Sequence, residues 1–156
     1  MELRLVGSEM CIRDRPNNIF VASFIGTPAM NFFEGKVKSC SKSLTTITLK
    51  DQKEIKLSSN IYKKDQDIIF GIRPEDISVN LDKKSKMKDS IELDAEISVI
   101  EPMGHETVVI CDSNYGELTG KVESSNTLKE NMNVKLIIKE EKVYQFDKMS
   151  EKNLLL

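Results

Sequence analysis

The side chains best suited to catalysis in this sequence flank one turn, E-P-M-G-H-E at residues 101–106. Glu101 and Glu106 are a pair of carboxylates of the kind that acts as general acid and base, and His105 could respond to pH because its unperturbed pKa is about 6.5. Such a pair must also converge in space, which spacing alone does not establish. Solvated turn residues are the commoner use of these types, so we expect no catalytic role for them.

Phosphate-binding patterns are also absent from the sequence. Gly35-Lys36 and Gly120-Lys121 lack the glycine five residues earlier that a phosphate-binding loop requires, and neither pair is followed by Ser or Thr. No G-x-S-x-G, H-E-x-x-H or G-x-G-x-x-G segment occurs. The sequence therefore predicts that this chain hydrolyses no nucleotide and holds no cofactor.

Metal binding and a secreted disulfide framework are equally unsupported. Cys11, Cys40 and Cys111 show no C-x-x-C spacing, and His105 is the only histidine, so a structural zinc site has too few ligands. An odd number of scattered cysteines favours a reducing, cytoplasmic setting. The net charge is -2, and the one basic run, residues 83–88, is expected to be a solvated loop.

The elements that would position these residues are mostly short strands. Alternating apolar and polar residues predict an all-β fold of small barrels of the oligomer-binding (OB) type, divided near residues 82–90 into two lobes that may exchange strands. The clearest segment is 91–101, where Ile91, Leu93, Ala95, Ile97 and Val99 are expected to face one side. The expected strands are 32–37, 44–49, 54–57, 66–72, 77–81, 91–101, 107–111, 117–122, 134–138 and 143–146.

One short helix precedes the strands. Asn17 or Asn18 can cap it, and Gly26 followed by Pro28 ends it, which predicts a helix over 18–25. Its apolar residues cover most of its circumference. We therefore expect this helix to lie between two bodies rather than on one.

Four segments resemble one known family. These are P-N-N-I-F-V-A-S-F-I-G-T-P-A-M-N-F at 16–32, G-I-R-P-E at 71–75, V-I-E-P-M-G-H-E-T at 99–107 and Y-Q-F-D at 144–147. In the same order they resemble the junction and the C-terminal regulatory motifs of MalK/UgpC-type ATP-binding subunits of ABC importers. The resemblance covers residues 16 to about 147 and implies OB-fold-like (TOBE) barrel lobes of short antiparallel strands.

The resemblance also implies a function. It predicts a regulatory and dimerisation region, in a subunit that uses ATP and Mg to drive import of sugars, glycerol phosphate or similar solutes. Implied partners are a second copy bound through the barrels, the ATPase domain and the membrane subunits, at the inner face of the cell membrane; nucleic acid is not among them. Regulatory or dimer-contact candidates are Arg73, Glu75, Glu101, Gly104, Glu106, Thr107, Phe146 and Asp147. Interdomain connector candidates are Phe20, Phe24, Ile25, Met30, Asn31 and Phe32.

The start of the chain departs from this family. Residues 6–15, V-G-S-E-M-C-I-R-D-R, resemble a translated sequencing adaptor, so residues 1–15 are interpreted as a non-native leader, and the ATPase domain that precedes the junction in the family is expected to be missing. The expected organisation is then a connector helix over 16–30, a first lobe over 31–82, a second over 91–147 and a tail over 148–156.

Two other functions remain open from the residues alone. A barrel of this type could bind an oxyanion or a small solute, although no site is visible in the sequence. A nucleic-acid-binding barrel should show a basic groove with stacking aromatic residues. The charge of -2, the absence of Trp and the presence of only three Tyr count against nucleic acid.

Overall fold

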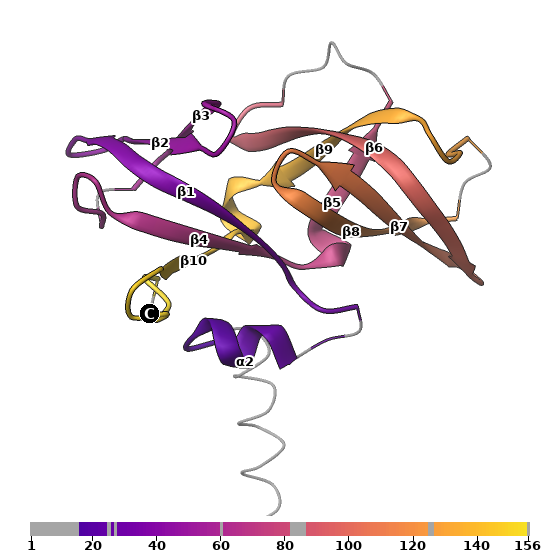
Figure 1. Ribbon diagram of the computed structural model, residues 1–156, viewed down its shortest axis with the longest axis horizontal. Coiled ribbons are helices and arrows are strands. Elements are labelled where there is room, and N and C mark those ends of the chain that lie inside the picture. The colour runs from indigo at the N-terminus through magenta and orange to yellow at the C-terminus, as the bar shows by residue number, and fades with distance from the viewer. Residues whose placement is uncertain are drawn as a thin grey trace, which may run out of the picture.

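The computed structural model describes residues 16–24, 26, 28–59, 61–81, 87–124 and 127–155 (Figure 1). The expected leader 1–15 and most of the basic run lie outside these residues. Helix α2 (Ile19–Phe24) comes first, and every later element is a strand or a single turn of 3-10 helix. The all-β prediction is confirmed. No helix in the described part of the chain is long and apolar enough to cross a membrane.

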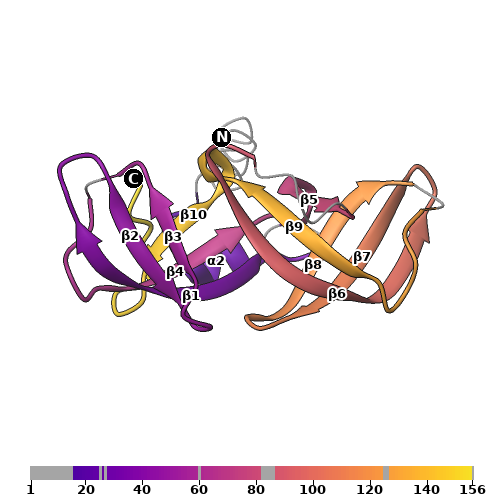
Figure 2. The ribbon, with the colours of Figure 1, turned by 90° about the horizontal axis from the view of Figure 1, so that it is seen from above.

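Two five-stranded antiparallel sheets make up the fold. The first sheet has the order β10-β4-β1-β2-β3, with bounds Tyr144–Asp147, Asp67–Ile72, Asn31–Cys40, Thr45–Leu49 and Glu54–Leu57. The second has the order β5-β9-β6-β7-β8, with bounds Ile77–Asn80, Asn133–Lys139, Ser90–Met103, Glu106–Ser113 and Gly116–Glu123. Figure 2 shows the two sheets, which we also call leaves, as curved layers lying side by side.

The division of strands between the sheets does not follow chain order. Strand β5 pairs with β9 in the second sheet, and β10 pairs with β4 in the first. Two 3-10 turns, Pro74–Asp76 and Glu140–Lys142, redirect the chain at these crossings. Pro74 cannot donate a hydrogen bond to a ladder, so the chain leaves the first sheet there. The expected lobes, 31–82 and 91–147, thus each give one strand to the other sheet; whether they are separate domains stays a prediction.

Strand β6 departs from the expected alternation at one point. Its register with β7 shifts between Ile97 and Val99, which marks a bulge. The four apolar residues expected to face inward before the bulge are buried, but Val99 is 38% exposed and Ile100 packs against the core instead. The prediction that Val99 faces the same side is wrong, because an extra residue in one strand of a pair shifts its alternation by one position.

One hydrophobic core joins the two sheets. Its buried cluster takes inward residues from strands of both sheets, such as Phe33 and Phe70 from the first and Leu93 and Leu136 from the second. The rings of Phe33 and Phe70 stack with centroids 5.1 Å apart. Because the sheets share one core, the two lobes are held as one body.

The outer face of the first sheet is covered at one end by α2 (Figure 1). A second apolar cluster forms there between the helix and the strands; its members are Ile19, Ala22, Met30, Phe32, Ile69, Tyr144 and Phe146. Side chains along β1 alternate between the two faces, so Glu34, Lys36 and Lys38 continue this face beyond the helix. The outer face is therefore apolar under the helix and charged beyond it.

Candidate functional site

Three of the four recognised segments converge beneath α2, and Gly71 is the reason they fit. A Cβ at position 71 would lie 2.7 Å from Met30 Sδ, 3.0 Å from Phe146 Cε2 and 3.3 Å from Phe32 Cε1. These distances are shorter than ordinary van der Waals contact, so only glycine allows this approach. The rings of Phe32 and Phe146 meet edge to face with centroids 6.3 Å apart. We call this contact the junction cluster, defined by Met30, Phe32, Gly71 and Phe146.

Arg73 extends the junction cluster at one side. Its guanidinium carbon lies 5.6 Å from the ring centroid of Tyr144, within range of a cation–π contact. Arg73 Nε is buried without a hydrogen-bond partner. Glu75, two residues on, is exposed on the short turn after the strand. The two candidate residues of this segment therefore lie in different surroundings. Arg73 packs on β10, and Glu75 faces solvent.

Asn31 ties the connector to the second sheet. Its side chain is buried, with Nδ2 donating to the carbonyl of Thr119 at 2.7 Å and Oδ1 accepting from the amide of Thr119 at 2.7 Å. A weaker contact of 3.4 Å joins Nδ2 to the carbonyl of Ile72. The amide of Asn31 thus pairs with the edge of β8 as a neighbouring strand would. It fixes the position of the first sheet relative to the second.

The helix is anchored to the C-terminal tail rather than to the strands alone. Asn18 caps it, because Val21 N donates to Asn18 Oδ1 at 2.9 Å. Ile19 N donates to the carbonyl of Glu151 at 3.1 Å. Asn153 holds the chain before the helix, with Nδ2 donating to the carbonyl of Pro16 and its backbone N donating to that of Asn17, each at 2.8 Å.

Helix α2 has a buried and an exposed side. Ala22 is buried against the junction cluster, whereas Phe20 is 66% exposed. The side chains of Phe24 and Ile25 lie outside the described part of the structure. One face of α2 is thus packed on the sheet, and Phe20 leaves an apolar surface on the other.

The third recognised segment lies elsewhere, at the end of the β6–β7 hairpin in the second sheet. Gly104 has φ +85° at the first position of its two-residue loop, which glycine favours. Ser124 Oγ donates to the carbonyl of Gly104 at 2.8 Å and lies 3.3 Å from the Oγ1 of the buried Thr107. Glu106 pairs with Lys121 at 2.7 Å. These contacts fasten the hairpin tip to β8 and its following residue.

Glu101 is exposed on this hairpin, opposite Val108 in the pairing of β6 with β7. Glu106, the other carboxylate of the pair considered for acid–base chemistry, is paired with Lys121 instead. Among the described residues, no group of three or more His, Cys, Asp or Glu is arranged to hold a metal ion. Glu101 thus lies exposed near the tip, whereas Glu106 is held in an ion pair.

Asp147 closes the last strand of the first sheet. Hydrogen bonds from Gln66 Nε2 at 2.9 Å and from Ser150 N at 2.8 Å hold the pKa of this carboxyl below its usual 3.8, the bond from Gln66 being the largest cause. The charged form is favoured because both donors stabilise it. Asp147 thus fixes the turn that leads into the tail.

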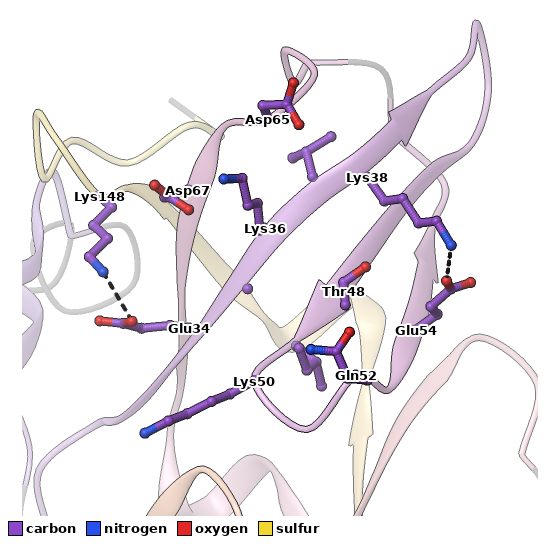
Figure 3. Close-up of a pocket in the computed structure, with 13 residues that line it drawn as sticks. Glu34, Lys36, Lys38, Thr48, Lys50, Gln52, Glu54, Asp65, Asp67 and Lys148 are labelled. Atoms are coloured by element: carbon purple, nitrogen blue, oxygen red, sulfur yellow. Dashed lines mark hydrogen bonds and ion pairs between the residues drawn. The ribbon is translucent and has the colours of Figure 1, made fainter.

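The charged half of the outer face forms an open pocket of about 550 Å³ (Figure 3). Lys148 pairs with Glu34 at 3.1 Å, and Lys38 pairs with Glu54. The charged residues that line this pocket are Glu34, Lys36, Lys38, Lys50, Glu54, Asp65, Asp67 and Lys148. Lysines and carboxylates are equal in number in this set, so the lining has no net positive charge that would attract an anionic ligand.

Comparison with known proteins identifies the part of the chain that holds strands β1 to β4. Residues 26–77 match the family model of the MalK OB fold domain. Residues 26–77 belong to the MalK OB fold family. This match confirms the resemblance drawn from the four segments and the OB-like fold that it implied.

Curated relatives extend the match along the MalK OB fold and beyond it. The multiple sugar-binding transport ATP-binding protein MsmK of Streptococcus mutans is 36% identical over 149 residues, 94% of this chain and 39% of the relative. The trehalose/maltose import ATP-binding protein MalK of Thermococcus litoralis is 29% identical over 154 residues, 96% of this chain and 41% of the relative. The chain spans about two fifths of the length of these relatives.

A solved structure supports the fold alone. The cytoplasmic molybdate-binding protein ModG superimposes with a TM-score of 0.64 over 74% of this chain and 94% of its own, at 15% identity. Sequence reasoning found the junction residues of the MalK OB fold because they form a long continuous motif. It missed Asn153 and Thr119, and it found Gly71 only as part of the segment 71–75 without its packing role, because these roles depend on contacts between segments far apart in the chain.

Proposed function

We propose that this chain is the regulatory and dimerisation region of the ATP-binding subunit of an ABC importer for sugars, glycerol phosphate or a similar solute. The observation that carries the proposal is the junction cluster, in which the connector segment packs directly on the G-I-R-P-E and Y-Q-F-D segments. Relatives whose names describe import ATP-binding proteins match nearly the whole chain, which supports the same assignment.

The architecture suits a rigid tether. Asn31 and the common core hold the two sheets together, and the tail fastens α2 at its start. A force applied to the helix would then move both sheets as one body. In the whole subunit, the ATPase domain would dock on the exposed side of α2 around Phe20, on the cytoplasmic side of the membrane. Two copies joined through the barrels would keep their ATPase domains close as these open and close around ATP, while this region hydrolyses no ATP itself.

Sedimentation velocity at chain concentrations of about 1 to 100 µM tests the dimer. If the dissociation constant of the dimer lies within these concentrations, the average sedimentation coefficient rises as the chain is concentrated. We expect a monomer–dimer equilibrium that Glu101→Lys or Glu75→Lys weakens, since both carboxylates are exposed at candidate contacts. Glu130→Lys is the matched control, because Glu130 is exposed on a loop outside the candidate set. A chain that stays monomeric throughout, or that dimerises equally in all three variants, contradicts the proposed contacts.

The variant Phe20→Ser distinguishes a specific dimer from non-specific association. An exposed phenylalanine alone can cause association, which the variant would remove. We expect the monomer–dimer equilibrium to survive Phe20→Ser, with less material in larger aggregates. Loss of the dimer in this variant would instead assign self-association to the connector helix.

A further inference from the structure

A second cavity, of about 550 Å³, lies where both sheets and the C-terminal tail meet. Figure 2 shows the start of β6 and the end of β9 beside β10, between the two leaves. The cavity has the size of clefts that hold small molecules, which run from roughly 300 to 1,000 Å³. Its wall is formed by Ser58, Ser59, Met87, Lys88, Asp89, Ser90, Lys139, Glu140, Glu141, Val143, Gln145 and Leu155.

A side-chain amide with an unsatisfied oxygen lies in this wall. The Gln145 side chain is 5% exposed, and its Oε1 is buried with no hydrogen-bond partner. Its neighbours Tyr144 and Phe146 belong to the cluster under the helix, so Gln145 points to the opposite face of β10. Buried polar groups in proteins are almost always hydrogen-bonded. Gln145 Oε1 therefore needs a hydrogen-bond donor that the described residues of the chain do not supply.

The hydroxyl of Tyr62 is buried beside Ser59 of the cavity wall. Burial raises the pKa of Tyr62 above its usual range, the negative charge of Glu140 raises it further, and a hydrogen bond with Ser59 acts in the opposite direction. Glu140 itself is engaged, because Ser58 N donates to its Oε1 at 2.6 Å. The unpartnered Oε1 of Gln145 is thus an uncharged acceptor.

The rest of the wall narrows the chemistry of the partner. Met87 and Leu155 are 51% and 52% exposed, and they give the cavity an apolar side. The three carboxylates of the wall outnumber its two lysines, which disfavours an oxyanion. A half-turn of a glutamine amide exchanges its donor and its acceptor, and a hydroxyl group can pair with either because it both donates and accepts. The ligand should therefore combine hydroxyl groups with an apolar C–H face.

We propose that this cavity binds an uncharged polyhydroxyl compound, a polyol or a sugar of one or two rings, through a hydroxyl group on the Gln145 amide. The C–H face of the ligand packs on Met87 and Leu155. The wall of the cavity takes residues from both sheets and from the tail. A bound ligand would therefore limit the motion of the two sheets relative to each other, and these sheets form the tether of the proposed function. Ligand binding here is independent of that function, because neither the junction cluster nor the β6–β7 hairpin tip contributes a residue to the wall.

The test uses the full chain, labelled with 15N, titrated with sorbitol, glucose and maltose, and separately with phosphate and sulfate. We expect at least one neutral compound to shift the side-chain amide of Gln145 and the backbone amides of residues 139–145. Gln145→Leu should weaken that binding at least tenfold without lowering the unfolding temperature, because the leucine replaces a polar group that has no partner. Gln52→Leu is the matched control: it removes an exposed glutamine outside the cavity and should leave binding unchanged.

Four results would overturn the proposal. The first is the absence of any shift at Gln145 with every neutral compound. The second is a shift produced by phosphate or sulfate instead, which would assign the site to an anion. The third is undiminished binding by Gln145→Leu, which would place the ligand away from this amide. A lower unfolding temperature in Gln145→Leu would show that the amide has a structural partner, and it would also contradict the argument.

Discussion

Replacing Asn31 by alanine tests how the two sheets are held together. In the folded chain the Asn31 amide makes two hydrogen bonds of 2.7 Å to the backbone of Thr119, at the edge of β8. Asn31→Ala removes both bonds and leaves the N–H and the carbonyl of Thr119 facing a space that the side chain filled. The variant leaves the pairing of β8 with β7 untouched.

The expected cost follows from the burial of these groups. A hydrogen bond contributes about 1 kcal/mol net, and a buried group left without a partner costs about 1 to 3 kcal/mol. Asn31 is 7% exposed but Thr119 is half-buried, so water can satisfy part of its backbone in the variant. We therefore expect Asn31→Ala to lower the free energy of unfolding by about 2 to 3 kcal/mol, or the unfolding temperature by about 5 to 10 °C.

Two measurements check this expectation. Urea unfolding followed by circular dichroism gives the free energy, with Asn133→Ala, at an exposed asparagine of β9, as the control that should change it by less than about 0.5 kcal/mol. Hydrogen exchange gives the local effect: the amide of Thr119 should lose protection in Asn31→Ala more than its neighbours do. Equal stability of the two variants, or an unchanged exchange rate at Thr119, would refute the role assigned to Asn31.

Three further predictions follow from the geometry. Gly71→Ala should destabilise the chain by about 1 to 3 kcal/mol through overpacking, whereas Gly120→Ala should be nearly neutral, because its added Cβ meets nothing closer than 3.6 Å; comparable urea midpoints for both would contradict this. The lowered pKa of Asp147 means that its contribution to stability is present above the usual 3.8 and lost as the pH falls through the lower folded value, so Asp147→Asn should flatten the acid limb of unfolding curves measured against pH. Burial raises the pKa of the Cys111 thiol to about 11, so iodoacetamide at about pH 8 should modify the exposed Cys40 and spare Cys111 until the chain unfolds, as peptide mass mapping can show.

The strands could be predicted from the sequence because alternation is a local signal. Each expected strand is present within a few residues of its predicted bounds. The bulge near Ser98 could not be predicted, because an inserted residue leaves the apolar pattern intact and is visible only in the pairing register. The exchange of β5 and β10 was foreseen only as a possibility, since strand partners depend on contacts between distant segments.

The junction cluster could be predicted in part from the sequence, whereas the cavity around Gln145 could not. Met30 and Phe32 of the junction segment come together with Phe146 of the last recognised segment at one contact, and all three are among the predicted candidate residues. The close packing of these residues on Gly71 could not be predicted, because the absence of a side chain carries no periodic signal. The cavity around Gln145 was beyond sequence reasoning, because its wall takes residues from four separate segments of the chain.

The exchanged strands also set the order in which this chain can be completed during synthesis. Strand β4 lacks one of its partners until β10, near the end of the chain, has left the ribosome. Until then an apolar sheet edge stays open, and such edges recruit strands from other chains. Pairing over this sequence distance is slow because the intervening loop must close first. A nascent chain interrupted before residue 144 would therefore be prone to aggregate, although nearly all of its core residues would already be present.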